Sequence, residues 1–206
     1  MARRSDHTPV ELRALFVARG HELMSERGLA AFSAREAARR AGYSVGSIYH
    51  VFGSLDAYIV AINTATLSQS TAWLRAELEA CAPGEDRLRR LVAGYFGFAE
   101  AHTNAWMAAY DHRRPREVEP DASDVAERVK LTAIVDKEVA AALGRPIDPA
   151  SKRLTRSLIA TVHGHCVMTV TGNFALMNEE DPVDQAVARV RESILWHRAG
   201  EGQGAA

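Results

Sequence analysis

The chain has 206 residues, 47% apolar and 25% charged, with a net charge of −1, a composition typical of a globular protein with a buried core. It has no run of about 18 apolar residues, and its first residues, Met-Ala-Arg-Arg-Ser-Asp-His, lack the apolar segment of a secretory signal. Two cysteines are too few for a disulfide framework or a four-cysteine zinc site. We therefore expect a cytoplasmic protein, without a membrane span, a metal or a cofactor.

The charge is unevenly distributed along the chain. Residues 1–53 contain eight Arg against five Asp or Glu, whereas residues 54–206 contain 17 basic and 21 acidic residues. A basic front on an acidic remainder indicates that the N-terminal end binds a polyanion. Ordinary scatter of surface charge is the alternative explanation.

The predicted elements are helices throughout. Thr8-Pro9-Val10-Glu11 is a capping box with proline in the first helical position, and Gly28 ends the amphipathic segment that follows. Ser33-Ala34-Arg35-Glu36 has the same capping-box spacing and opens a short helix that Gly42 ends. Ser44 is a good N-cap for a third short helix, at about 45–52.

Longer helical segments follow Gly53. They are predicted at about 55–80, 86–101, 104–113, 123–143, 148–172 and 182–198. No alternating segment bounded by hairpin turns is present, so the predicted fold class is all-α. We place a three-helix domain at 1–53, a domain of about six helices at 54–198 and a disordered tail at 199–206.

The stretch FSAREAARRAGYSVGSIYHVF, residues 32–52, carries the functional signal. Two short helices joined by a turn that contains a glycine form a helix-turn-helix. Its small and large apolar residues are expected to pack inward: Phe32, Ala37, Ala38, Ala41, Ile48 and Phe52. The residues left facing outward are Ser44, Val45, Gly46, Ser47, Tyr49 and His50. Small, polar and aromatic residues at a helix N-terminus suit entry into a DNA major groove.

These residues receive different expected roles in DNA binding. We assign base contacts to Ser44, Val45, Ser47 and Arg35, and phosphate contacts to the helix N-terminal amides, Ser33, Arg35, Tyr49 and His50. Arg3 and Arg4 precede the first helix and can reach an adjacent minor groove, although a solvated terminus is the alternative.

Residues of about 10–60 resemble the DNA-binding domain of the TetR family of bacterial repressors. The resemblance rests on Gly28 after the first helix, Ser33 at the start of the second, Ala41-Gly42 in the turn and Tyr49-His50-Val51-Phe52 at the end of the recognition helix. It implies a double-stranded DNA operator as partner, and a helical remainder that binds a small-molecule inducer and dimerises.

One position departs from the family pattern. The family usually places a phosphate-binding lysine after the phenylalanine, and this chain has Leu55, followed by Asp56. The loss of one charged phosphate contact predicts weaker and less salt-dependent DNA binding.

The C-terminal half resembles a TetR-family C-terminal domain named for a Trp-His-Gly motif. The resemblance rests on residues 105–115, AWMAAYDHRRP, and on 160–176, ATVHGHCVMTVTGNFAL, where Val162 replaces the Trp and His163-Gly164 matches. It implies a small-molecule inducer without naming one.

A set of aromatic and polar-tipped residues could line the inducer pocket. An apolar ligand with one or two polar groups would suit them. The candidates are Tyr95, Phe98, Trp106, Tyr110, His163 and Met168. Ordinary core packing is the alternative for each of them.

Two histidines raise the question of a metal site. His163 and His165 are two residues apart on a helix, so their side chains diverge and cannot share an ion. His163 and Cys166 could, but two ligands make a poor site. Packing roles are expected, and Gly164 between the histidines suggests close helix approach at a dimer contact or a cavity wall.

In the TetR family the last two long helices form the dimer bundle, which here implies a homodimer through about 148–172 and 182–198. Their apolar positions include Leu154, Leu158, Val162, Val183, Val187, Val190, Ile194 and Leu195. A twofold dimer predicts a palindromic operator.

The sequence leaves three functions to consider for this protein. The first is a ligand-responsive transcriptional regulator, most simply a repressor. The second is a helical ligand-binding or interaction protein with weakened or lost DNA binding, suggested by Leu55 and Asp56. The third is an enzyme, but the sequence has no phosphate loop, nucleophile elbow, His-Glu-x-x-His or paired-cysteine motif that would support it.

Overall fold

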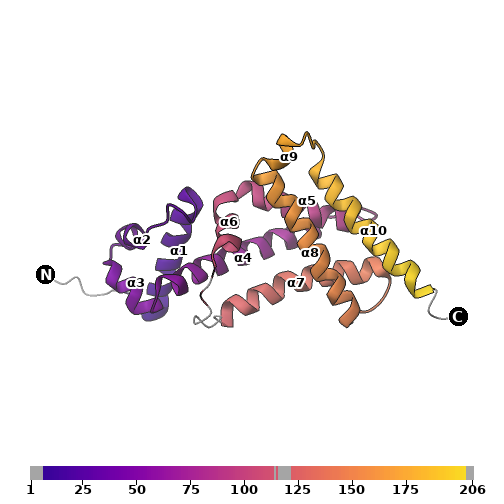
Figure 1. Ribbon diagram of the computed structural model, residues 1–206. Coiled ribbons are helices and arrows are strands. Elements are labelled where there is room, and N and C mark those ends of the chain that lie inside the picture. The colour runs from indigo at the N-terminus through magenta and orange to yellow at the C-terminus, as the bar shows by residue number, and fades with distance from the viewer. Residues whose placement is uncertain (1–6, 114, 116–121, 203–206) are drawn as a thin grey trace. The chain divides into compact units, whose positions relative to one another are not determined.

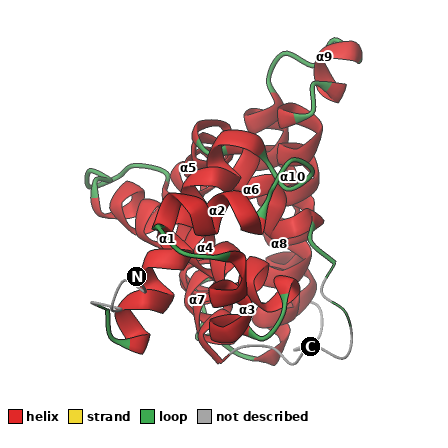
Figure 2. Ribbon diagram, turned by 90° about the vertical axis from the view of Figure 1, so that its left-hand side faces the viewer, coloured by secondary structure: helices red, strands yellow, loops and turns green. Residues whose placement is uncertain are grey.

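The computed structural model describes residues 7–113, 115 and 122–202, and these form ten helices and no strand (Figures 1 and 2). The first four helices are α1 (Pro9–Arg27), α2 (Ala34–Ala41), α3 (Val45–Phe52) and α4 (Leu55–Glu79). They are followed by α5 (Arg87–Ala101), α6 (Thr103–Asp111), α7 (Ala122–Leu143), α8 (Pro149–Val170), α9 (Asn173–Leu176) and α10 (Pro182–Gly202). The predicted all-α fold class is confirmed.

Most helix limits agree with the predicted ones to within two residues. Two differences stand out. The single turn α9 was not predicted as a helix, and α10 continues to Gly202, four residues into the segment 199–206 that was predicted to be disordered. Residues 203–206 of that segment lie outside the described part of the chain.

Local capping explains where the first helices begin. Thr8 accepts a hydrogen bond from the Glu11 amide at 3.3 Å, and the Glu11 carboxylate accepts one from the Thr8 amide at 2.7 Å, so the predicted capping box is complete. Ser33 makes only half of the second box. Its hydroxyl accepts from the Glu36 amide at 3.4 Å, whereas the Glu36 carboxylate pairs with arginines instead.

The chain folds into two compact units. The first unit comprises residues up to 69 together with 102–128, and the second comprises 70–101 together with 129–206. The long helix α4 contributes its first residues to one unit and its last to the other. The predicted limit of the DNA-binding domain, near residue 53, is a finer division inside the first unit and stays a prediction.

Aromatic rings fill the core of the first unit. Tyr58 is fully buried, and its hydroxyl donates to the Phe16 carbonyl oxygen at 2.7 Å. The Tyr58 ring lies 4.7 Å from the Phe52 ring, centre to centre. The buried members of this core are Phe16, Leu23, Met24, Ala37, Ala38, Ile48, Phe52, Tyr58, Ile59, Ala61, Ile62 and Ala108. Helices α1 to α4 are thereby fixed around a single cluster, with α6 against α1.

The second unit has a leucine cluster, and ion pairs connect its helices. Leu74, Leu78 and Leu91 form the cluster, and α8 packs along α10. Arg87 donates to both carboxylate oxygens of the buried Glu138, at 2.8 and 2.9 Å. Two further pairs, Arg89 with Asp184 and Arg191 with Asp86, join α5 and the segment before it to α10.

Within the described residues, no helix by itself has the length and hydropathy needed to cross a membrane, although α3 and α4, which are bent by 80° relative to each other, reach that threshold as a pair.

Candidate nucleic-acid interface and ligand pockets

The helix-turn-helix is formed by α2, a short turn and α3. Gly42 ends α2 with φ of 80°, a left-handed conformation in which glycine is favoured, and the Tyr43 amide donates to the Ala38 carbonyl oxygen at 2.9 Å. Ala37, Ala38 and Ile48 have no exposed surface, so the two helices are anchored to the core through their inner faces. The opposite face of α3 is thereby held in a defined orientation.

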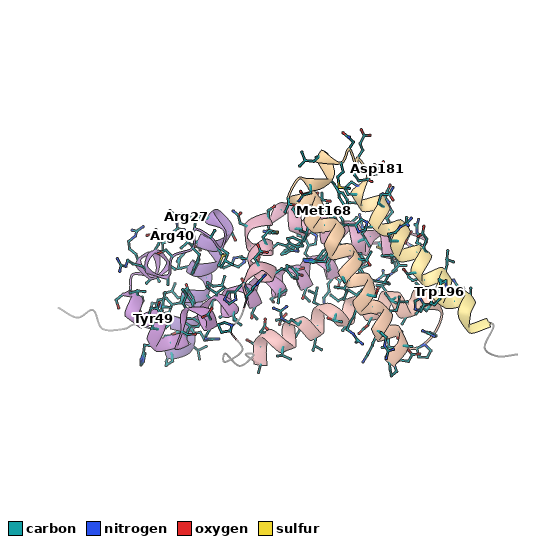
Figure 3. All side chains as sticks on the ribbon, in the orientation of Figure 1. Arg27, Arg40, Tyr49, Met168, Asp181 and Trp196 are labelled. Carbon is teal, nitrogen blue, oxygen red and sulfur yellow. The ribbon has the colours of Figure 1, made fainter. Side chains whose placement is uncertain are left out.

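The predicted DNA-contact residues of α3 lie mostly on its exposed face. Ser44, Gly46, Tyr49 and His50 are exposed, and Tyr49 keeps 44% of its surface accessible (Figure 3). Ser47 is half-buried, with its hydroxyl 3.2 Å from that of Ser44.

Val45 differs from its neighbours on α3. It is half-buried and packs against the first unit's core, so it does not face fully outward as the sequence analysis expected.

The N-terminal end of α3 lacks a side-chain cap. Ser44 occupies the N-cap position, but its hydroxyl makes no hydrogen bond to an amide of the first turn. The Ser47 amide donates to the Ser44 carbonyl oxygen at 3.1 Å, whereas the first two amides, those of Val45 and Gly46, have no partner inside the helix and remain donors for an anion. This end of α3 can therefore bind a phosphate through its backbone.

The positive charge around α2 is partly neutralised. Glu36 accepts hydrogen bonds from the side chains of Arg39 and Arg40, and these bonds lower the pKa of its carboxyl to about 2. Arg40 also donates to both carboxylate oxygens of Glu26, at 2.7 Å each. The predicted contact Arg35 is exposed on the same helix, and Ser33 is half-buried as the N-cap.

The segment before α1 is attached to the helix-turn-helix. His7 Nδ1 lies 2.9 Å from the Tyr43 hydroxyl, and the two rings meet edge to face. The sequence did not predict this contact, because His7 lies outside the helix-turn-helix motif and 36 positions from Tyr43. Arg3 and Arg4, the predicted minor-groove residues, lie outside the described residues.

Leu55 stands at the first position of α4 and is 38% exposed. Ser54 accepts a hydrogen bond from the Ala57 amide at 3.0 Å, as a helix N-cap does. The neighbouring Asp56 carboxylate oxygen Oδ1 is 3.0 Å from His112 Nε2. Asp56 is therefore engaged with the end of α6, a role that the sequence did not indicate.

Four of the predicted ligand-binding residues belong to the second unit. The Tyr95 hydroxyl and His163 Nδ1 are 2.9 Å apart, and both residues are half-buried. Met168 is half-buried on α8. Phe98 is buried and its ring contacts the ring of Trp73, so Phe98 occupies a core position.

The other two predicted ligand-binding residues, Trp106 and Tyr110, belong to the first unit. Their ring centres are 5.2 Å apart on α6. Trp106 is almost fully buried, whereas Tyr110 is exposed. The six residues are thus divided between the two units, and within the second unit a hydrogen bond joins Tyr95 to His163.

The histidines of α8 have partners inside the protein. His163 pairs with Tyr95, and His165 Nδ1 lies 2.9 Å from the Thr161 carbonyl oxygen. Burial raises the pKa of the Cys166 thiol to about 12, so this thiol is not activated. Across the described residues, no three His, Cys, Asp or Glu side chains are grouped as metal ligands.

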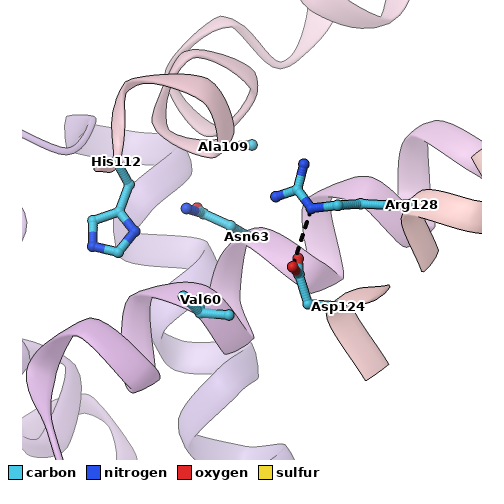
Figure 4. A pocket seen from close by; sticks show the side chains of 6 residues that line it. All are labelled: Val60, Asn63, Ala109, His112, Asp124 and Arg128. Carbon is cyan, nitrogen blue, oxygen red and sulfur yellow. Dashed lines mark hydrogen bonds and ion pairs between the residues drawn. The ribbon is translucent and has the colours of Figure 1, made fainter. Parts of the chain in front are cut away.

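The first unit contains a polar cavity that sequence analysis missed. It is lined by Val60, Asn63, Ala109, His112, Asp124 and Arg128, which come from α4, α6 and its C-terminal end, and the start of α7 (Figure 4). These residues are spread over nearly 70 positions and match no motif, so only the fold assembles them.

Helices α8 and α10 were predicted to form the dimer, but most of their apolar residues are buried inside the chain. Leu154, Leu158, Val187, Val190 and Ile194 are buried in the second unit. Val162 and Val183 are half-buried, and Leu195 is exposed. Trp196, next to it on α10, is 72% exposed (Figure 3).

Comparison with known proteins places these features in a family. Residues 16–62 match the profile described as bacterial regulatory proteins, tetR family, and residues 88–193 match the tetracyclin repressor-like, C-terminal domain. The first match contains the whole helix-turn-helix, and the second covers just over half of the chain. No relative was found among curated proteins.

Solved structures share the fold at low sequence identity. A protein of unknown function from Rhodococcus sp. RHA1 is 22% identical, with a TM-score of 0.67 over 94% of this chain and 97% of its own. A tetR-family transcriptional regulator from Streptomyces coelicolor is 18% identical, with a TM-score of 0.64 over 95% and 86%. The multidrug binding protein EbrR, complexed with imidazole, is 20% identical, with a TM-score of 0.61 over 89% and 94%.

The two profile matches together account for both halves of the chain, the helix-turn-helix and the helical remainder. The chain therefore belongs to the TetR family of transcriptional regulators, with an N-terminal DNA-binding domain and a C-terminal ligand-binding domain.

Proposed function

We propose that this protein is a ligand-responsive repressor that binds a palindromic operator as a homodimer in the cytoplasm, and that a small, largely apolar inducer releases it. The exposed face of α3 carries the proposal. Its inner residues Ile48 and Phe52 are buried, so Ser44, Gly46, Tyr49 and His50 are presented on a rigid support.

The roles on that face follow from side-chain chemistry. Ser44, Ser47 and Arg35, with the half-buried Val45, contact base edges, and Gly46 allows close approach of the backbone. The α3 amides, Ser33, Tyr49 and His50 contact phosphates.

The homodimer is proposed to form through α8 and α10. Leu195 and Trp196 are large apolar side chains exposed on α10, and a methyl group added at Gly164 of α8 would meet no described atom within 4 Å apart from its chain neighbours and the adjacent backbone of its own helix. An exposed apolar surface of this kind favours association. Trp196→Arg should therefore convert the dimer to a monomer in sedimentation equilibrium, and an unchanged dimer would contradict this interface.

The inducer is proposed to contact the second unit near Tyr95 and His163. These residues are half-buried and joined by a hydrogen bond. The half-buried Met168 lies just over one turn beyond His163 on α8. Such a site offers apolar surface with one polar pair. Inducer binding is expected to change operator affinity through a coupling of about 1–3 kcal/mol.

The decisive experiment is enrichment and sequencing of genomic fragments on the purified protein, at about 150 mM salt to suppress nonspecific binding. A shared palindrome upstream of a few genes is the expected result. No enrichment by a folded dimer, with or without extracts that contain small molecules, would overturn the repressor function.

Tyr49→Ala tests the phosphate contacts. Because phosphate contacts carry no sequence information, this variant should weaken binding to the operator and to random DNA alike. Loss confined to the operator would instead assign Tyr49 to base recognition.

Leu55→Lys tests the departure from the family pattern. The lysine should tighten DNA binding and steepen the dependence of log affinity on log salt by about one unit. An unchanged slope would show that this position does not face the DNA backbone.

A second candidate function has one observation in its favour. Leu55 replaces a cation, and Arg39 and Arg40 are held in ion pairs, which reduces the positive charge available to DNA. A ligand-binding or interaction protein with weakened or lost DNA binding would show no enriched palindrome. It would also show a flat salt dependence with random DNA.

A further inference from the structure

The polar cavity of the first unit has a volume of about 260 Å³ (Figure 4). Val60 and Ala109 supply apolar surface, and Asn63, His112, Asp124 and Arg128 supply polar groups. None of these residues belongs to the predicted DNA-contact or inducer-contact sets.

Asn63 carries a buried hydrogen-bond acceptor that is not satisfied. The residue is 3% exposed, and its Nδ2 donates to the Ala108 carbonyl oxygen at 3.1 Å. Its Oδ1 has no hydrogen-bond partner among the described residues. A buried acceptor without a partner is destabilising, so a bound N–H group would be stabilised here.

His112 adds a second acceptor to the lining. Its Nε2 lies 3.0 Å from the Asp56 carboxylate, which only accepts hydrogen bonds, so Nε2 carries a proton. In the neutral ring, Nδ1 is then an acceptor. The residue forms the C-cap of α6, and its side chain lines the cavity.

Asp124 supplies negative charge. It is 5% exposed, and its carboxylate accepts from Arg128 Nε at 3.0 Å and from the Thr64 hydroxyl at 3.4 Å. Arg128 balances the charge of Asp124, and the Asp56 carboxylate, which contacts His112, adds a second negative charge beside the cavity.

We propose that this cavity binds a small organic cation that carries two or more N–H groups, such as an amidinium. Its N–H groups would satisfy Asn63 Oδ1 and His112 Nδ1, and its apolar part would lie against Val60 and Ala109. A cavity of about 150 Å³ accommodates benzene, so about 260 Å³ accommodates a ring with an amidinium group. As a statement about what regulates this protein, the proposal rests on the function proposed above.

The test uses three near-isosteric probes and the full-length protein without DNA. Benzamidine is cationic with N–H donors, benzamide is neutral with N–H donors, and benzoate is anionic without them. Isothermal titration calorimetry should show benzamidine binding about tenfold more tightly than benzamide, because benzamidine carries a positive charge and N–H donors on both nitrogens, with benzoate weakest. Equal binding of benzoate and benzamidine, or no binding of benzamidine, would overturn the proposal.

Two variants locate the binding. Asp124→Asn keeps the side-chain shape but removes the charge, and should weaken benzamidine binding about tenfold with little effect on benzamide. Asp136→Asn, the same change on the same helix but outside the cavity lining, is the matched control and should leave both affinities unchanged.

Ala109→Leu places a larger side chain in the cavity wall and should abolish benzamidine binding while circular dichroism stays helical. It provides a second test if Asp124→Asn fails to fold. Unchanged binding in Ala109→Leu would overturn the site. Because every titration omits DNA, a negative result refutes this pocket alone, whereas a lack of enriched genomic fragments refutes the regulator function.

Discussion

The two units of this protein are stabilised in different ways. In the first unit, Tyr58 is fully buried between Phe16, Phe52 and Gly20, so the fit depends on side-chain shape. In the second unit, a smaller leucine cluster is accompanied by Arg–carboxylate pairs that connect distant segments, among them Arg87 with Glu138.

The difference has a physical consequence. A close-packed aromatic core responds steeply to the addition of a single carbon, because neighbouring atoms have nowhere to move. An ion pair with one exposed partner contributes less to the stability of the protein, because water screens its charges. Substitutions that alter such a pair are therefore tolerated better. The first unit should therefore be sensitive to volume, and the second to the loss of a buried charge partner.

Gly20→Ala should have the largest effect. A Cβ at this position would lie within 3.0 Å of the Tyr58 hydroxyl oxygen and ring and of Ile62 Cδ1. Overpacking of a tight core costs about 1–3 kcal/mol, and this site belongs at or above the upper end, because the Tyr58 hydroxyl is also held by the Phe16 carbonyl. Urea unfolding of the purified variant measures the loss.

Gly97→Ala, on α5 of the second unit, is the matched control for that substitution. Its Cβ would meet only Trp73 Cζ2, at the ordinary contact distance of 3.8 Å, and alanine in place of a helical glycine stabilises by about 0.5–1 kcal/mol. Equal destabilisation of both variants would remove the steric argument and with it the contrast between the units.

Glu138→Gln should have an intermediate effect. The carboxylate is buried and binds Arg87 through two hydrogen bonds, but the Arg87 side chain is 43% exposed. Solvent screening of the arginine reduces the expected loss to about 1–2 kcal/mol. Thermal unfolding should show it, while Glu192→Gln, in the exposed pair with Arg189, should stay within about 0.5 kcal/mol of the parent.

The smallest expected effect is on stability at acid pH. It qualifies the contrast between the units, because ion pairs within α2 also stabilise the first unit. The pKa of Glu36 is about 2 in the folded protein and about 4.5 without its arginine partners. Since the folded pKa is the lower one, this stabilisation is complete above pH 4.5 and is lost as pH falls through about 2.

Glu36→Gln should therefore flatten the fall in melting temperature between these two pH values, with little change at neutral pH. Parallel curves for the variant and the parent across that window would contradict a role for the Glu36–arginine pairs in acid stability.

Local signals made much of the fold predictable. Thr8 and Pro9 begin α1, Gly28 ends it and Gly42 ends α2, because capping and backbone freedom depend on residues within one helical turn. The helix-turn-helix and its family could be identified for the same reason, since its motif is contiguous.

Other features depended on residues far apart in sequence. The capping box expected at Ser33 was incomplete because Glu36 has stronger partners in Arg39 and Arg40. Val45 turned partly inward because the core of the first unit extends beneath it. Hydrophobic periodicity identifies an apolar face of a helix but does not indicate what covers it. It therefore could not tell which apolar residues of α8 and α10 pack in the chain's own core and which contact a partner.

The sequence by itself determined where most helices begin and end, the helix-turn-helix and the family, because these depend on short-range chemistry. Only the tertiary structure brought His112 to Asp56, across 56 residues, and Asp124 to Thr64, across 60, and so created the polar cavity. Such contacts arise from the burial of whole helices, and no local pattern in the chain encodes which polar side chains then meet.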